Sequence, residues 1–271
     1  MKTNLRLGFT ALLGETRLLG EFLSFTFRGF FQRTLPDSCH QRGAVLLIPG
    51  FGAGDVTLSP LGLRLAELGY RIFSTGIWCN VDCPVHTLSR LEKVLRKASS
   101  RTGAKVSIVG HSLGGIYARE LACRFPNLVE RVILLGSPVR EPLRSSNRFL
   151  TPLFEFWHRR CAGDLSTTEA EEVEMSPVPP RPPETLIYSR TDGVVQWHSC
   201  IESGANVEAI EVSSSHCGLP YCPKAFQVIV ERLAQSSRRS RSLAADPAAR
   251  DDRPVRRIHT TRTSAKVTQV A

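Results

Sequence analysis

Residues 105–115 read KVSIVGHSLGG, and this stretch decides the expected fold. Lys105–Val109 is expected to form a strand, like the apolar, β-branched run Gly43–Ile48, which is typical of a strand buried on both faces of a parallel sheet. A helix is expected from Gly114 to Arg124. Ser112 therefore stands on a sharp turn between strand and helix, within the pattern G-x-S-x-G. The glycines at 110 and 114 carry no side chains that would crowd such a turn.

Strand and helix patterns alternate on both sides of this turn, from residue 43 to residue 135 and again after residue 183. Strands are expected at Gly43–Ile48, Tyr70–Thr75, Arg131–Leu135, Thr185–Ser189 and Val207–Val212, and helices at Ser59–Gly69, Val85–Ser99 and Lys224–Ala234. Alternation of this kind predicts an α/β protein with a mostly parallel central sheet and helices on both faces.

Residues 137–183 interrupt the alternation with eight prolines. This stretch is interpreted as a lid-like or cap insertion above the carboxyl ends of the strands, where such folds place substrate-binding elements. The chain then divides into three parts: an amphipathic helical segment at 1–40, a single α/β domain at 41–235, and a disordered basic tail at 236–271.

The N-terminal segment is apolar and aromatic from residue 5 to residue 31. Charged residues such as Glu15 and Arg17 interrupt it, so it does not resemble a secretory signal. We interpret Thr10–Phe31 as an amphipathic helix, which either packs on the domain or rests on a membrane or lipid surface through its phenylalanines. A cytoplasmic or peripheral membrane location is therefore favoured.

The net charge of +10 does not by itself indicate nucleic-acid binding, because much of it lies in the tail. Residues 236–271 hold nine Lys and Arg residues against three Asp. A solubilising tail is the simpler interpretation, and contact with anionic lipid or nucleic acid is the alternative. The eight cysteines lack the paired spacing of a zinc ribbon, so structural thiols or one or two disulfides are favoured over a metal site, and no cofactor is expected.

A serine hydroxyl at the turn could act as a nucleophile only with an oriented base. Three histidines follow Ser112 outside the insertion. His216 comes directly after a predicted strand, in a loop of small residues that would let its ring reach the sheet edge. His198 lies within a predicted helix and His259 in the tail. His216 is therefore the predicted base.

The other expected parts of the site follow from their positions along the chain. Asp192, in a turn just after the strand ending at residue 189, is the predicted acid that orients the histidine, and Asp164 in the insertion is its rival. The backbone N–H groups of Phe51 and Leu113 are the predicted oxyanion-hole donors. Asp192 could instead be only a turn former.

Apolar residues in the insertion offer a candidate wall for a substrate. Leu150, Phe154 and Trp157 recur at near-helical spacing and would contact an acyl chain. The alternative is that these side chains pack on the body of the domain.

The segments VLLIPGFGAGD at 45–55, VSIVGHSLGG at 106–115 and the loops around residues 192 and 216 resemble the lipase/esterase branch of the α/β-hydrolase superfamily. The likeness is closest to bacterial proteins described as α/β hydrolases or triacylglycerol lipases. Lipases often have His–Gly where this chain has Pro49–Gly50. The resemblance implies hydrolysis of carboxylic esters, with a lipophilic ester such as an acylglycerol as the expected substrate. An acyltransferase using the same three residues, or a non-enzymatic binding protein on the same scaffold, are the alternatives.

Overall fold

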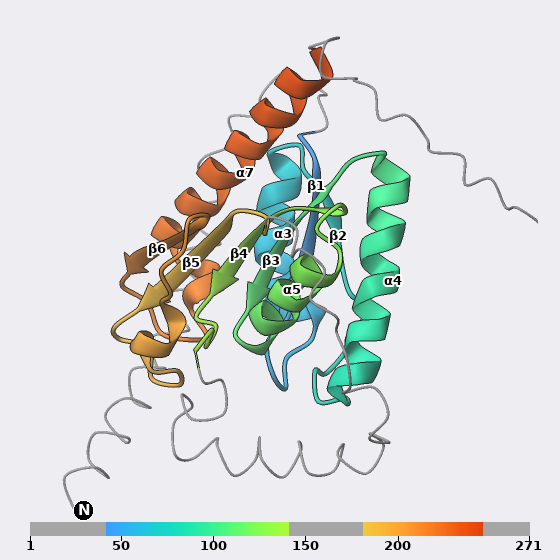
Figure 1. Ribbon diagram of the computed structural model, residues 1–271. Helices are drawn as coiled ribbons and strands as arrows, with labels where there is room; N and C mark the ends of the chain where they lie inside the picture. Colours follow the sequence, from blue (N-terminus) through green and yellow to red (C-terminus); the bar gives the residue numbers. More distant parts are fainter. Residues whose placement is uncertain (1–41, 141–180, 246–271) are drawn as a thin grey trace, which may run out of the picture.

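A single sheet of six parallel strands organises the protein (Figure 1). The computed structural model describes residues 42–140 and 181–245 of the 271-residue chain. The strands are β1 (Ala44–Ile48), β2 (Arg71–Phe73), β3 (Val106–His111), β4 (Val129–Leu135), β5 (Glu184–Ser189) and β6 (Val207–Val212). Their order across the sheet is β2-β1-β3-β4-β5-β6. This confirms the α/β class and the parallel sheet.

Helices cover both faces of the sheet, which is why the central strands are apolar throughout. Alternate residues of β1 enter two separate cores. Ala44, Leu46 and Ile48 pack with α4 (Pro84–Thr102) and α5 (Leu113–Arg124). Val45 and Leu47 pack with α3 (Ser59–Glu67) and α7 (Pro223–Ala245) on the other face.

The chain changes direction across the sheet between β1 and β3. From β1 it moves outward to β2 at one edge, and α4 then carries it back past β1 to β3. From β3 the strands follow one another to β6 at the opposite edge. In open parallel sheets the loops diverge at such a point and leave a crevice at the carboxyl ends of the strands, where ligands bind. The loop after β1 and the turn after β3 both lie there.

Element boundaries differ from the expected ones mainly at helix ends. Helix α4 begins one residue earlier, with Pro84 in its first turn, and continues to Thr102 before Gly103 ends it in a left-handed conformation. Helix α7 runs to Ala245, so that residues 236–245 of the expected disordered tail are helical. No Gly or Pro occurs between Ser236 and Ala245, so nothing in that stretch ends the helix.

Several expected features lie outside the described residues. These are the N-terminal segment at 1–40, most of the insertion (141–180) and the tail beyond residue 245. The amphipathic helix and the lid therefore stay predictions. Within residues 42–140 and 181–245, no helix is both long and apolar enough to cross a membrane.

Candidate active site

Ser112 occupies a strained turn at the carboxyl end of β3. Its φ of 53° and ψ of −121° make it the one non-glycine residue with positive φ in the described part of the chain. Such a conformation is costly for a residue with a side chain, and it persists only where surrounding contacts enforce it. The Ser112 N–H donates to the Leu135 carbonyl at 2.8 Å, and the Ser112 carbonyl accepts from the Gly115 N–H at 3.0 Å.

Glycines make this turn sterically feasible. A Cβ on Gly110 would lie 2.4 Å from the carbonyl oxygen of Gly114, and one on Gly114 would lie 2.2 Å from that of Ile48. Both distances are well inside van der Waals contact. The close approach of α5 to β1 and β3 therefore requires glycine at both positions, and it holds Ser112 at the carboxyl end of β3.

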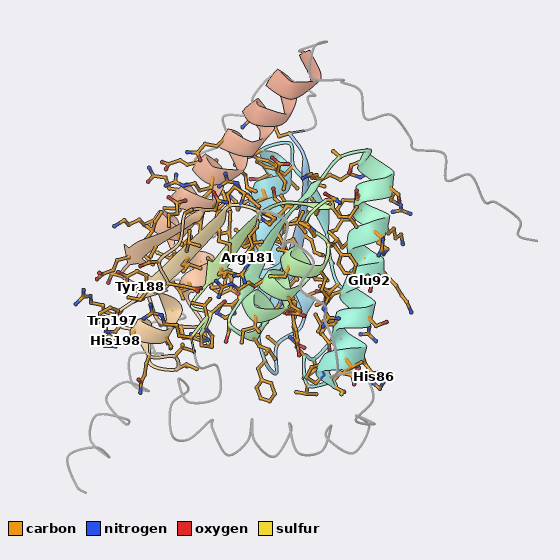
Figure 2. The ribbon with its side chains drawn as sticks, viewed as in Figure 1. His86, Glu92, Arg181, Tyr188, Trp197 and His198 are labelled. Carbon is orange, nitrogen blue, oxygen red and sulfur yellow. The ribbon has the colours of Figure 1, made fainter. Side chains whose placement is uncertain are left out.

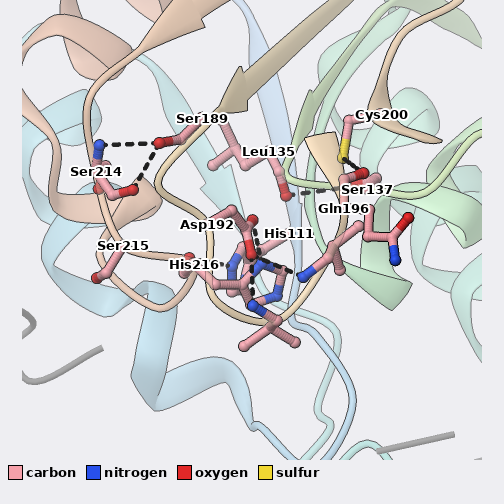
Figure 3. A network of polar contacts seen from close by, with 12 residues as sticks. His111, Leu135, Ser137, Ser189, Asp192, Gln196, Cys200, Ser214, Ser215 and His216 are labelled. Carbon is pink, nitrogen blue, oxygen red and sulfur yellow. Dashed lines mark hydrogen bonds and ion pairs between the residues drawn. The ribbon is translucent and has the colours of Figure 1, made fainter. Parts of the chain in front are cut away.

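His216 and Asp192 form a buried pair (Figure 3). The His216 Nδ1 lies 2.6 Å from the Asp192 Oδ2, and the two side chains are 5% and 1% exposed. The Asp192 Oδ1 accepts from the N–H groups of Val194 and Val195 at 2.8 and 2.7 Å. With Nδ1–H donated to the carboxylate, Nε2 is the ring nitrogen that is left to take up a proton.

Hydroxyl groups tie together the two loops that carry this pair. The Ser189 hydroxyl, at the end of β5, donates to the Ser214 carbonyl at 2.7 Å, and the Ser214 N–H donates back to it at 3.2 Å. The Thr191 hydroxyl donates to the same Ser214 carbonyl at 3.0 Å. These bonds fix the loop of Asp192 against the loop of His216, although 24 residues separate the two side chains along the chain.

His111 contacts the same histidine loop from the side of the serine. Its Nε2 lies 3.0 Å from the His216 carbonyl, and the two rings are 4.9 Å apart between centroids. Burial, followed by the nearby His216, lowers the pKa of His111 from 6.5 to about 3. His111 is therefore neutral near pH 7, and its Nε2–H donates to the carbonyl. Sequence reasoning passed over His111, because its position in the turn gives no sign of this contact.

The expected oxyanion-hole residues lie on either side of Ser112. Leu113 is the first residue of α5, so its N–H belongs to the helix N-terminus, where amide groups lack acceptors in the preceding turn. Phe51 lies in the loop after β1 and is partly buried against the core. A Cβ on the neighbouring Gly50 would lie 3.1 Å from the Ser112 Cβ, so this loop runs directly against the turn.

His198, the other described histidine named from the sequence, is not part of this arrangement. His198 is exposed and stacks on Trp197 at 3.6 Å, beside Tyr188 (Figure 2). Several other candidates lie outside the described residues. They are His259, the rival acid Asp164 and the expected substrate-contacting residues Leu150, Phe154 and Trp157.

The described cysteines and acids form no metal site. In residues 42–140 and 181–245, no group of three or more His, Cys, Asp or Glu side chains could hold a metal ion. Cys79, Cys83, Cys123, Cys200 and Cys222 carry free thiols. Burial, with a smaller contribution from Asp192, raises the pKa of the Cys200 thiol, so that it stays protonated near pH 7 and is a poor nucleophile.

Comparison with known proteins identifies the fold. Residues 85–179 match the family described as the PGAP1-like alpha/beta domain. A monoacylglycerol lipase from Paleococcus ferrophilus superimposes with a TM-score of 0.52 at 15% identity, over 72% of this chain and 95% of that one. The protein has the α/β-hydrolase fold. Comparison with curated proteins gives no significant sequence match.

Other solved structures share the α/β-hydrolase fold. A soluble variant of the monoglyceride lipase from Saccharomyces cerevisiae, in complex with a substrate analog, has a TM-score of 0.50 at 14% identity and covers 75% of this chain and 88% of that one. Polyneuridine aldehyde esterase has a TM-score of 0.50 at 16% identity and covers 73% and 100%. All three structures are lipases or esterases, and at these identities the likeness establishes the fold alone.

Proposed function

We propose that this α/β-hydrolase-fold protein is a serine hydrolase that cleaves carboxylic esters. The observation that carries the proposal is the buried His216–Asp192 pair, with its 2.6 Å contact, in a loop that is hydrogen-bonded to His111, the neighbour of a serine held at positive φ. Acyl transfer by a serine requires an oriented imidazole within reach of its hydroxyl, and the positions of Ser112 and of the His216–Asp192 pair support this role. The neighbouring folds of lipases and esterases also support a hydrolase.

In the first half of the reaction, the Ser112 Oγ attacks the ester carbonyl carbon while the His216 Nε2 accepts the hydroxyl proton. The carbonyl oxygen becomes an oxyanion, which the N–H groups of Phe51 and Leu113 stabilise. Asp192 holds the imidazole in the required tautomer and stabilises the imidazolium. Neutral His111 adds no positive charge beside that imidazolium. The imidazolium then protonates the leaving alcohol, the C–O bond breaks, and an acyl-enzyme remains.

In the second half, water takes the place of the alcohol. His216 accepts a proton from the water as its oxygen attacks the acyl carbon, and a second oxyanion forms in the same hole. The bond to Ser112 Oγ then breaks, His216 returns the proton to the serine, and the carboxylic acid leaves. Ser112, His216 and Asp192 thereby return to their starting protonation states.

The test of this proposal is the hydrolysis of p-nitrophenyl esters by the full chain. Wild-type protein should release p-nitrophenol, and Ser112→Ala should lose about 10⁴-fold or more in kcat, because the covalent step is removed. Ser100→Ala, an exposed serine on α4, is the matched control and should keep wild-type activity. Equal turnover by wild type and Ser112→Ala would refute the assignment. Products formed with an added alcohol distinguish hydrolysis from acyl transfer.

A lipophilic ester is the substrate class that the available observations favour. Two of the fold neighbours are lipases described as acting on monoacylglycerol or monoglyceride. Apolar side chains stand exposed near the loop after β1, among them Trp78 at 94% and Val56 at 75%. Exposed apolar groups beside a crevice are typical of surfaces that receive an apolar ligand. Leu150, Phe154 and Trp157 of the insertion are proposed to contact the acyl chain.

A chain-length series tests the substrate class. For wild type, kcat/KM should rise with acyl length while each added methylene is buried, by about 0.8 kcal/mol per CH₂. Phe154→Ala and Trp157→Ala should reduce kcat/KM more for long-chain than for short-chain esters. A flat profile in wild type and variants alike would identify a small-ester esterase instead.

A further inference from the structure

We propose that Asn80 is a positioning residue for the oxyanion hole, holding the loop that carries Phe51 in the conformation that the reaction needs. This inference rests on the proposed function, and it adds to it a residue that lies on neither of the expected donor segments. Asn80 belongs to the loop between β2 and α4, some thirty residues after Phe51 in the chain.

Asn80 makes hydrogen bonds on both sides of Phe51. Its side-chain Nδ2–H donates to the Pro49 carbonyl at 2.8 Å. Its backbone N–H donates to the Ala53 carbonyl at 2.8 Å, and its own carbonyl accepts from the Gly52 N–H at 3.0 Å. One residue therefore holds the segment before Phe51 and the segment after it.

The loop after β1 needs these hydrogen bonds from Asn80 because it is rich in glycine. Gly50 and Gly52 flank Phe51, and Gly52 has a φ of +68°. Glycine permits conformations closed to other residues, so the peptide unit that bears the Phe51 N–H could rotate if its neighbours were free. Fixing Pro49 and Gly52 restricts that rotation. An oxyanion donor is effective only when it is already aimed before charge develops.

Packing alone does not explain why residue 80 is an asparagine. The residue is 1% exposed, and within residues 42–140 and 181–245 its buried side-chain Oδ1 has no hydrogen-bond partner. A buried polar atom without a partner costs roughly 1–3 kcal/mol. The amide orientation is fixed, because a flipped side chain would set its oxygen against the Pro49 carbonyl oxygen. An apolar side chain would avoid this cost. The hydrogen bond from Nδ2 to the Pro49 carbonyl is therefore the feature that explains asparagine at position 80.

Further hydrogen bonds join the loop before Asn80 to the end of the loop after β1. The Asp55 carboxylate accepts from the Thr75 hydroxyl at 2.6 Å and from the Gly76 N–H at 2.7 Å. The Asp55 N–H donates to the Ile77 carbonyl at 2.9 Å. The segment before Asn80 is therefore joined to the residue that follows the glycine-rich loop, so the two loops form one unit.

The experiment compares an ester with its thionoester, in which sulfur replaces the carbonyl oxygen. Sulfur is a weak hydrogen-bond acceptor, so the thionoester gains little from the hole. Asn80→Asp keeps the volume but replaces the donor to Pro49 with an acceptor, and Asn80→Ala removes the donor without adding a charge. Asn206→Asp is the matched control, because the Asn206 amide also donates to a backbone carbonyl, that of Arg181, but at the surface.

Both Asn80 variants should lose about 10- to 100-fold in kcat/KM on the oxoester, because the donor is misaligned rather than removed. The loss should appear in kcat more than in KM, and the thionoester rate should fall about threefold at most. Asn206→Asp should match wild type on both substrates. The ratio of the two rates does not depend on the amount of folded protein, so partial unfolding of one variant cannot imitate the effect.

Two results would overturn the inference while leaving the proposed function intact. One is wild-type oxoester activity in both Asn80 variants. The other is an equal loss on both esters, which would give Asn80 a purely structural role. A wild-type protein that is folded and hydrolyses neither ester would instead refute the proposed function, and the positioning role with it.

Discussion

The two sides of the candidate site are built in different ways. On the acid–base side, the groups are side chains that contact one another directly: Asp192 holds His216, and His111 holds the backbone of the same loop. On the proposed oxyanion side, the groups would be the backbone N–H groups of Phe51 and Leu113, which lie in a glycine-rich loop and at a helix start. The chemistry of the acid–base side depends on which side chains are present, whereas that of the oxyanion side depends on the conformation of the backbone.

This difference predicts how each side responds to substitution. A single isosteric change on the acid–base side alters the tautomer or the charge of a reacting group, so its effect should be large. On the oxyanion side, no side chain takes part in the reaction. A substitution there can only change the direction in which a backbone N–H group points. Losses there should be smaller and graded, as for the Asn80 variants.

The largest effect is expected from Asp192→Asn. An amide in place of the carboxylate can donate to the His216 Nδ1 and so stabilise the wrong tautomer, which should reduce kcat about 10⁴-fold. Ester kinetics with a folded variant measure this loss. Asp164→Asn, at the rival acid in the insertion, should keep wild-type kcat. The opposite outcome for the two variants would transfer the acid to the insertion.

A smaller effect is expected from His111→Leu. Without its Nε2–H, the His216 carbonyl loses a donor 3.0 Å away, and the catalytic loop gains freedom next to Ser112. We expect kcat to fall about 100-fold with little change in KM, because a displaced base affects the reaction more than binding. His111→Gln can present an amide N–H at a similar distance and should restore most of the activity. If both variants lost the same amount, the hydrogen bond would not be the cause.

The smallest effect concerns stability rather than rate. The pKa of His111 is lowered from 6.5 to about 3 by burial and by His216. Between these values the unfolded chain binds a proton at His111 that the folded protein does not bind. The stability associated with keeping His111 neutral is therefore fully present above pH 6.5. It is lost as the pH falls toward 3, because the unfolded chain then gains a proton at this residue.

Urea unfolding at two pH values measures this contribution. From pH 7 to pH 5, wild type should lose about 2 kcal/mol more of its free energy of unfolding than His111→Gln, which has no titrating group there. Equal losses in the two proteins would show that the buried ring takes up a proton as readily as the unfolded one.

The fold could be predicted from the sequence because its strongest signals are local. The apolar run at 106–109, the glycines of the turn and the helix after it lie within one short stretch, and the structure places β3 and α5 there. The alternation of strand and helix patterns along residues 43–135 likewise predicts the parallel sheet from local signals. The extension of α7 to Ala245 differs from the sequence prediction, because the polar and basic composition after residue 235 favours a disordered tail although no Gly or Pro ends the helix there.

Contacts between distant loops could not be predicted in this way. Asn80 occurs in an irregular stretch between β2 and α4, and nothing in its neighbours shows that it lies against the loop after β1. The partner of His111 is 105 residues away in the chain. The sequence indicates only their general location, because His111 ends β3 and Asn80 lies in the loop after β2, on the side of a parallel sheet where ligands bind. Choosing among such residues required the structure.

The central claim is that Ser112 is an activated nucleophile, and fluorophosphonate labelling followed by peptide mass spectrometry tests it most directly. The probe forms a stable bond only with a serine whose hydroxyl is deprotonated by a neighbouring base. We expect one adduct per chain, on the peptide that contains Ser112, and none in Ser112→Ala. A folded wild-type protein that stays unlabelled at Ser112, or that is labelled at another serine in both proteins, would contradict the account.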